Sequence, residues 1–266
     1  MEELRYTNGA YRTGPVRITF IARALTSLTF YIRLFLIVVR GSAQAKRGRY
    51  GTPEWCENSL ATLRALEAAG VKFEITGTDA FKAVEGPCVF IANHMSTLET
   101  FALPTIIAPF KDATFVVKQS LVDYPIFKHI MRSRDPITVG RTNPRDDLRA
   151  VLEGGTERLK AGRSVIIFPQ TTRTPVFDPA QFNTIGIKLA KKAGVPVVPV
   201  ALTTKAWGNG AYLKDYGRID PSKKTRFAFG KPLRIRDRGT EEHQEIIDFI
   251  SGKLREWEAE DQAGKP

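Results

Sequence analysis

Short apolar runs recur along most of the chain, and the segments between them have the pattern of helices. The runs are rich in Val, Ile and Phe, as buried strands are, and they lie at 71–75, 88–92, 114–118, 137–139, 164–168, 195–202 and 226–230. Helices are expected after Thr52, from about Thr97, from Pro144, and over Ile185–Ala193 and Thr240–Trp257. Alternating helices and continuous apolar strands predict an α/β fold with a largely parallel sheet flanked by helices.

The most apolar stretch, Val16–Arg40, is interrupted by Arg23 and Arg33. A spanning helix needs about 20 mostly apolar residues, and a central arginine is costly in a bilayer. We therefore favour a helix lying in the membrane interface, with its arginines reaching the lipid headgroups. A spanning helix and a helix buried on its own domain are the alternatives. The expected organisation is a membrane-associating segment and basic linker, 1–52, followed by an α/β domain, 53–266.

The chain is basic, because Lys plus Arg exceeds Asp plus Glu by 40 − 28 = 12. This excess favours anionic partners, which include nucleic acid, anionic lipids and phosphorylated ligands, although a solvated surface also accounts for it. The cysteines, Cys56 and Cys88, lack CxxC spacing, so neither a metal site nor a disulfide framework is expected. Charge alone does not choose among these partners.

Polar sequences follow several of the predicted strands. They are NHMSTLE at 93–99, GRTNPR at 140–145 and QTTRT at 170–174. The carboxyl ends of parallel strands share one edge of a sheet, where chemistry gathers in open α/β folds. We therefore expect these sequences to converge on one crevice.

His94 is the candidate general base, since imidazole titrates near neutral pH. Glu99 is the nearest carboxylate that could orient it. Residues five apart in an unbroken helix lie roughly 140° apart and would not face each other. The pair can therefore meet only if His94 precedes the helix and Glu99 lies in its first turns. The alternative is an ordinary strand-end histidine and a surface glutamate.

Three cations follow successive strand ends: Lys118, Arg141 and Arg173. An arginine at such a position can bind phosphate through its forked donors. Each alone is more often a plain surface cation, but three in the same setting favour a phosphate site.

Together these residues resemble the glycerophospholipid acyltransferase family, which includes 1-acylglycerol-3-phosphate acyltransferases. The resemblance runs from about Pro87 to Leu233. It is carried by Asn93-His94 with Glu99 (the NHxxxxD motif), ITVGR ending in Arg141, Gln170-Thr171-Thr172-Arg173 (the Glu-Gly-Thr-Arg motif), VPVVPV with Pro199, and Lys118 in the stretch between the first two motifs. The order and spacing of these motifs make a chance match improbable.

The chain departs from the family pattern at several positions. Glu99 replaces Asp, which is one methylene shorter. Gln170 replaces Glu and removes a charge near the expected acceptor phosphate. Thr171 replaces Gly at a position where the backbone can need a positive φ or a close approach. The chain therefore differs most from the family pattern on the side of the site that is expected to bind the acceptor.

The resemblance implies an enzyme of phospholipid biosynthesis. It would move a fatty acyl group from acyl-CoA or acyl carrier protein to the hydroxyl of a lysophospholipid, 1-acyl-glycerol-3-phosphate above others. His94 and Glu99 would be catalytic, and Arg141, Arg173 and Lys118 would hold the phosphate. Asn93, Gln170, Thr171 and Thr172 would support the motifs or the oxyanion. No cofactor and no metal is implied, and the N-terminal segment would hold the protein at the cytoplasmic face of a membrane.

Two alternatives stay open at this stage. One is a lipid-binding homologue without catalytic activity, which the changes at Gln170 and Thr171 favour. The other is an acyltransferase with a different acceptor. A nucleic-acid-binding protein is disfavoured, because no nucleic-acid motif is present and the histidine pattern would be unexplained. The sequence leaves open the acyl donor, the chain length and the oligomeric state.

Overall fold

The computed structural model describes residues 3–264 other than 126, 171 and 211–213. The strands are β1 (Tyr11–Arg12), β2 (Phe73–Thr76), β3 (Val89–Ala92), β4 (Ala113–Lys118), β5 (Ile137–Val139), β6 (Ser164–Ile167), β7 (Val197–Thr203) and β8 (Thr225–Phe229). The helices are α1 (Phe20–Ala24), α2 (Thr26–Lys46), α3 (Thr52–Ala68), α4 (Thr78–Lys82), α5 (Leu98–Ile107), α6 (Gln119–Val122), α7 (Phe127–Ser133), α8 (Pro144–Lys160), α9 (Ile185–Ala193) and α10 (Thr240–Ala263), with a 3-10 turn at Pro179–Gln181.

One sheet with the order β1-β2-β8-β7-β3-β6-β4-β5 organises the domain. Strands β7, β3, β6, β4 and β5 run parallel to one another, whereas β8 is antiparallel to β7 and β1 to β2. The prediction of a largely parallel sheet in an α/β fold is confirmed. Because these five parallel strands run the same way, the segments that follow them all emerge at one edge of the sheet.

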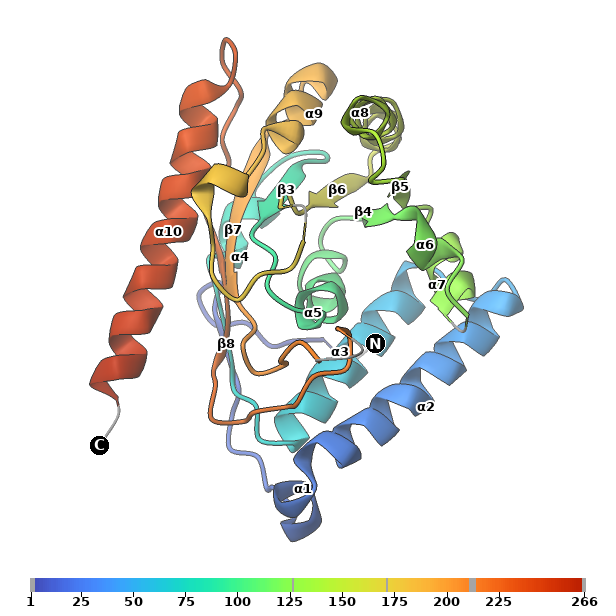
Figure 1. The fold of residues 1–266 in the computed structure, drawn as a ribbon, viewed down its shortest axis with the longest axis vertical. Coiled ribbons are helices and arrows are strands. Elements are labelled where there is room, and N and C mark those ends of the chain that lie inside the picture. Colours follow the sequence, from blue (N-terminus) through green and yellow to red (C-terminus); the bar gives the residue numbers. More distant parts are fainter. Residues whose placement is uncertain (1–2, 126, 171, 211–213, 265–266) are drawn as a thin grey trace.

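Helices cover both faces of this sheet (Figure 1). Helices α2, α3 and α5 lie on one face, and α8, α9 and α10 lie on the other. Strand β3 shows the two-residue alternation that this arrangement requires, since Phe90 enters the first core and Val89 and Ile91 enter the second. Both faces of the central strands are therefore buried, which explains their continuous apolar runs.

The N-terminal helical segment differs in detail from its prediction. The helix breaks at Leu25, and α2 then continues past Arg40 to Lys46. Thr52 is the first helical residue of α3, and the N-cap is Gly51, whose backbone N–H donates to Glu54. The Glu54 carboxylate therefore pairs with the N-cap backbone, and the Thr52 hydroxyl donates to Asp112.

Helix α2 has two apolar faces. Phe30, Leu34 and Val38 are buried against the domain, where α2 packs along α3 and α7. By length and composition α2 is able to cross a membrane, but only 22% of its most apolar window is buried in the protein. The helix therefore belongs to the core on one side and presents an apolar surface on the other.

Asn93 joins the ends of β3 and β7. Its side-chain amide donates to the Leu202 carbonyl and accepts from the Leu202 N–H, both at 2.9 Å. The side chain is almost fully buried, so no water replaces these bonds when they are lost. Asn93 thus extends the pairing of the two strands by one residue and fixes the segment that follows β7.

We expect Asn93→Ala to lower the free energy of unfolding by about 2 kcal/mol, because it leaves two buried backbone groups of Leu202 unpaired. Urea unfolding followed by circular dichroism measures this loss. Asn143→Ala, which removes an exposed helix cap, is the control and should cost about 1 kcal/mol or less. Equal losses for the two variants would contradict the role assigned to Asn93.

Candidate active site

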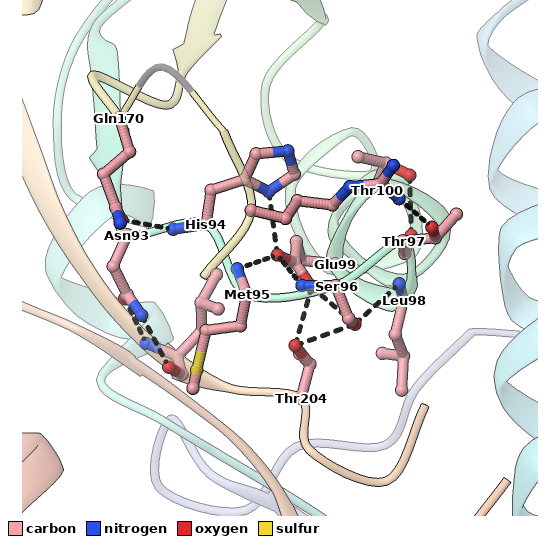
Figure 2. A network of polar contacts seen from close by, with 12 residues as sticks. Asn93, His94, Met95, Ser96, Thr97, Leu98, Glu99, Thr100, Gln170 and Thr204 are labelled. Carbon is pink, nitrogen blue, oxygen red and sulfur yellow. Dashed lines mark hydrogen bonds and ion pairs between the residues drawn. The ribbon is translucent and has the colours of Figure 1, made fainter. Parts of the chain in front are cut away.

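The structure brings His94 and Glu99 into contact. Strand β3 ends at Ala92, the turn 93–97 follows, and α5 places Glu99 in its first turn. His94 Nδ1 lies 2.8 Å from Glu99 Oε1 (Figure 2). The break between strand and helix is what allows residues five apart to face each other, as the sequence analysis required.

Glu99 is fully buried, yet it is surrounded by donors. The backbone N–H groups of Met95 and Ser96 donate to Oε1 at 2.6 and 2.8 Å, and the Thr204 hydroxyl donates to Oε2 at 2.7 Å. Burial acts to raise the pKa of this carboxyl, but the hydrogen bonds and the His94 ring outweigh it, so the pKa lies below its ordinary value of 4.5. Glu99 is therefore an ionised acceptor at neutral pH.

The partner of Nδ1 fixes the tautomer of His94. An ionised carboxylate only accepts, so Nδ1 carries the proton and Nε2 keeps its lone pair. The ring stacks on Phe168 with centroids 4.2 Å apart and planes 15° apart. Figure 2 shows Nε2 on the side of the ring away from Glu99, and the side chain stays 13% exposed. The imidazole that carries Nε2 is thus held in place by the stack on Phe168 and by the hydrogen bond to Glu99.

Gln170 and Thr174 hold the backbone of His94 from the neighbouring strand end. The His94 N–H donates to Gln170 Oε1 at 2.7 Å, and the Thr174 N–H donates to the His94 carbonyl at 3.0 Å. Gln170 Nε2 in turn donates to the Thr174 hydroxyl. A neutral amide oxygen can accept the His94 N–H as well as a carboxylate oxygen can. Gln170 therefore makes the same kind of contact that a glutamate at this position could make.

Other expected support residues have different positions. Thr171 lies outside the described residues, and Thr172 lies in an exposed bend. Asn93 is placed as support for the sheet rather than as an oxyanion donor, because its amide pairs with Leu202. The backbone N–H groups of residues 94–96 are engaged by Gln170 and Glu99. They are not available to an oxyanion in this arrangement.

The three expected phosphate cations follow β6, β4 and β5, which are adjacent in the sheet. Arg173 comes close to the His94 turn, where its Nη1 donates to the Thr97 hydroxyl and to Asp215, the latter at 2.6 Å. Lys118 ends β4 and is exposed. Arg141 is exposed after β5, with a φ of 59°, and its N–H donates to the Asp147 carboxylate. Arg173 therefore contacts the same turn that carries His94.

Several residues of the site were not identified from the sequence. Thr204, Ser96 and Phe168 all contact the His94–Glu99 pair, and Asp215 pairs with Arg173. The Thr203-Thr204 doublet directly after an apolar strand was a usable signal, of the same kind as the one that identified His94. Within the described residues, no group of three or more His, Cys, Asp or Glu side chains is arranged to hold a metal ion.

Known proteins resemble this chain in sequence and in fold. Residues 72–203 match the family model described as Acyltransferase. The 1-acyl-sn-glycerol-3-phosphate acyltransferase of Pseudomonas aeruginosa is 33% identical over 174 residues, which are 65% of each chain. The chain belongs to the glycerophospholipid acyltransferase family. A second member of the family, the chloroplastic 1-acyl-sn-glycerol-3-phosphate acyltransferase BAT2 of Brassica napus, is 30% identical over 49% of this chain and 37% of its own length.

A solved structure of the family has the same fold. The crystal structure of the 1-acyl-sn-glycerophosphate acyltransferase of Thermotoga maritima superimposes with a TM-score of 0.69 over 90% of this chain and 97% of that one, at 20% sequence identity. The chain spans 65% of the Pseudomonas protein and 37% of the Brassica protein. The matched region contains His94, Glu99 and Gln170, and it ends at Thr203, one residue before the Thr204 that bonds Glu99.

We expect Glu99→Gln to lower the free energy of unfolding at pH 7 by about 2 kcal/mol, because a hydrogen-bonded buried carboxylate is lost. The folded pKa of Glu99 is lowered, so its ionised form stabilises the fold above pH 4.5, and this contribution is lost as the pH falls through the folded pKa. Urea unfolding at pH 7, 5 and 3.5 should show the two proteins converging in acid. Glu85→Gln, an exposed carboxyl, is the control; a gap that stays constant with pH would refute the assignment.

Proposed function

We propose that this protein transfers a fatty acyl group from a thioester donor, acyl-CoA or acyl carrier protein, to the hydroxyl of 1-acyl-glycerol-3-phosphate. The observation that carries the proposal is the 2.8 Å contact between His94 Nδ1 and the buried Glu99 carboxylate, which leaves Nε2 as an oriented base. Membership of the family and the names of the similar proteins support the reaction class and the acceptor.

The proposed reaction needs no nucleophile from the protein. His94 Nε2 takes the proton of the acceptor hydroxyl as the hydroxyl oxygen attacks the thioester carbonyl. Glu99 stabilises the imidazolium that forms, in the same way as the carboxylate of a Ser-His-Asp triad. When the C–S bond breaks, the thiolate leaves and takes the proton back from His94. The products are the diacylated lipid and the free thiol.

The acceptor phosphate is assigned to the cations that follow β6, β4 and β5. Arg173 is already oriented by Asp215 through Nη1, which leaves the rest of its forked guanidinium for a second anion. Lys118 and Arg141 lie farther along the same edge. The contact from Gln170 to the His94 N–H persists without a charge, and this favours an active enzyme over the inactive homologue.

Membrane association is supported by the outward face of α2, formed by Leu28, Ile32, Phe35 and Leu36. More than half of the surface of each of these side chains is exposed, although each is apolar. Arg33 on the same helix is also exposed and can reach lipid headgroups. We propose that this face lies in the headgroup region of the cytoplasmic leaflet and brings the site to its lipid substrates.

We expect His94→Ala to lower kcat/KM for acyl transfer by about 1,000-fold, the range of general-base catalysis. Initial rates with palmitoyl-CoA or acyl carrier protein and 1-oleoyl lysophosphatidate measure the change, and circular dichroism verifies folding. The control is His129→Ala, a half-buried histidine on α7, which should retain wild-type rates. Turnover that survives in His94→Ala would remove the base assignment, and a wild-type protein without turnover would remove the proposed function.

We expect the double variant Phe35→Glu, Leu36→Glu to lose about 10-fold or more in affinity for vesicles that contain phosphatidylglycerol, because two apolar side chains no longer enter the interface. Vesicle co-sedimentation measures this. The control places the same two charges on exposed positions of α10, as Ala259→Glu and Gln262→Glu. If both double variants lose affinity equally, net charge rather than the face of α2 drives binding.

A further inference from the structure

The two oxygens of Glu99 are held by different parts of the chain. The donors to Oε1 come from residues 94–96, directly before the helix that carries Glu99. Oε2 accepts from Thr204 at 2.7 Å, a residue 105 positions away at the end of β7, and the Ser96 hydroxyl lies 3.1 Å from the same oxygen. Figure 2 shows the Thr204 side chain approaching the carboxylate from the side opposite to the His94 ring. Local contacts therefore hold Oε1, whereas Oε2 also receives a bond from a neighbouring strand.

A continuous chain of hydroxyl groups ends on this oxygen. The Leu98 N–H donates to Ser96 Oγ at 3.1 Å, Ser96 Oγ donates to Thr204 Oγ1 at 3.0 Å, and Thr204 Oγ1 donates to Glu99 Oε2. Ser96 and Thr204 are both buried. In this order each hydroxyl accepts one hydrogen bond and donates its single proton to the next oxygen. The Leu98 N–H is thereby connected to the Glu99 carboxylate, and both hydroxyl groups are satisfied.

This arrangement suits a glutamate in particular. Glu99 is one methylene, about 1.5 Å, longer than the aspartate of the family motif, and it has one more rotatable bond. Rotation about that bond would carry both carboxylate oxygens away from their donors, and the Ser96 hydroxyl does not prevent this when its one proton is donated to Thr204. Thr204 removes this freedom, and its own position is fixed by the pairing of Asn93 with Leu202 two residues earlier.

We propose that Thr204 is a positioning residue for acyl transfer, which acts through Glu99 by holding the carboxylate in the orientation that receives the His94 Nδ1 proton. This inference rests on the proposed function. Thr204 bonds Glu99 from the side opposite to the His94 ring, so its effect falls on the chemical step rather than on lipid binding. Thr204 and the longer acidic side chain thus form a matched pair.

The first test compares Thr204→Val and Thr204→Ala with Thr204→Ser, which keeps the hydroxyl. Initial rates with acyl-CoA and lysophosphatidate should show kcat lowered about 10-fold in the valine and alanine variants, as a lost hydrogen bond to a charged group predicts, with KM changed less than about 2-fold. The serine variant should stay within about 2-fold of wild type. Thr203→Val, at the adjacent buried strand position, is the matched control. A loss that appears mainly in KM, or equally in Thr203→Val, would overturn the proposal.

A double-mutant cycle tests whether Thr204 acts through Glu99. Glu99→Asp withdraws the carboxylate from Thr204 and should itself lower kcat. In that background, Thr204→Val should lower kcat by less than about 2-fold, because the contact is already absent. A full 10-fold loss in both backgrounds would show that Thr204 acts independently of the carboxylate.

A measurement without turnover separates this inference from the proposed function. The Nδ1 proton of His94 can be observed by NMR and assigned by its absence in His94→Gln. Thr204→Val should shift this signal upfield and speed its exchange with water, while Thr203→Val should leave it unchanged. A wild-type protein that does not transfer acyl groups would refute the proposed function, whereas an unchanged Nδ1 signal in folded Thr204→Val would refute the role of Thr204.

Discussion

The structure of the site depends on one constraint, which is that the Glu99 carboxylate is ionised and fully buried. A buried charge is tolerated only where donors surround it, so every segment near it must supply a donor in a fixed place. The turn after β3 supplies two backbone N–H groups and the His94 ring, and the end of β7 supplies Thr204. The same contacts that make the charge tolerable also select the tautomer of His94. Stability and catalytic geometry are therefore two results of a single arrangement.

The sheet order explains how distant segments meet at this carboxylate. Strand β3 lies between β7 and β6, and all three are parallel, so the turn that carries His94 has a strand end on each side. Gln170, after β6, holds the His94 backbone, while Thr204, after β7, holds the Glu99 side chain. The cations follow β6, β4 and β5, so the phosphate side of the edge lies only on one side of His94. An acceptor lipid that spans this edge would place its phosphate and its reacting hydroxyl at separate strand ends.

Much of this arrangement could be predicted from the sequence, and the limits have physical causes. The central strands were located because burial on both faces requires continuous apolar runs, and β5 and α9 were placed with their observed bounds. The His94–Glu99 contact followed from a strand-to-helix break. The position of Thr204 after an apolar strand was a usable signal, but its contact with Glu99, 105 positions away, and the contact of Asp215 with Arg173, 42 positions away, leave no periodic pattern. Asn93 was predicted to support the motif or the oxyanion, since the sequence shows its chemistry but not its pairing with Leu202. The short α4, α6 and α7 helices have too few residues for a detectable period.

The N-terminal segment and the site share one core, although the sequence suggests a separate anchor. Phe30 of α2 meets the Trp207 ring edge-on at 4.9 Å, and Trp207 stacks on Phe101 of α5, the helix that carries Glu99. The Trp207 indole N–H donates to the carbonyl of Asp215, whose side chain holds Arg173. Removing residues 1–45 would therefore uncover this aromatic cluster and disturb the site as well as the membrane contact. The two faces of α2 serve different purposes: the inner face completes the core behind the site, and only the outer face is available to lipid. Such a double role requires a helix that is apolar on both faces.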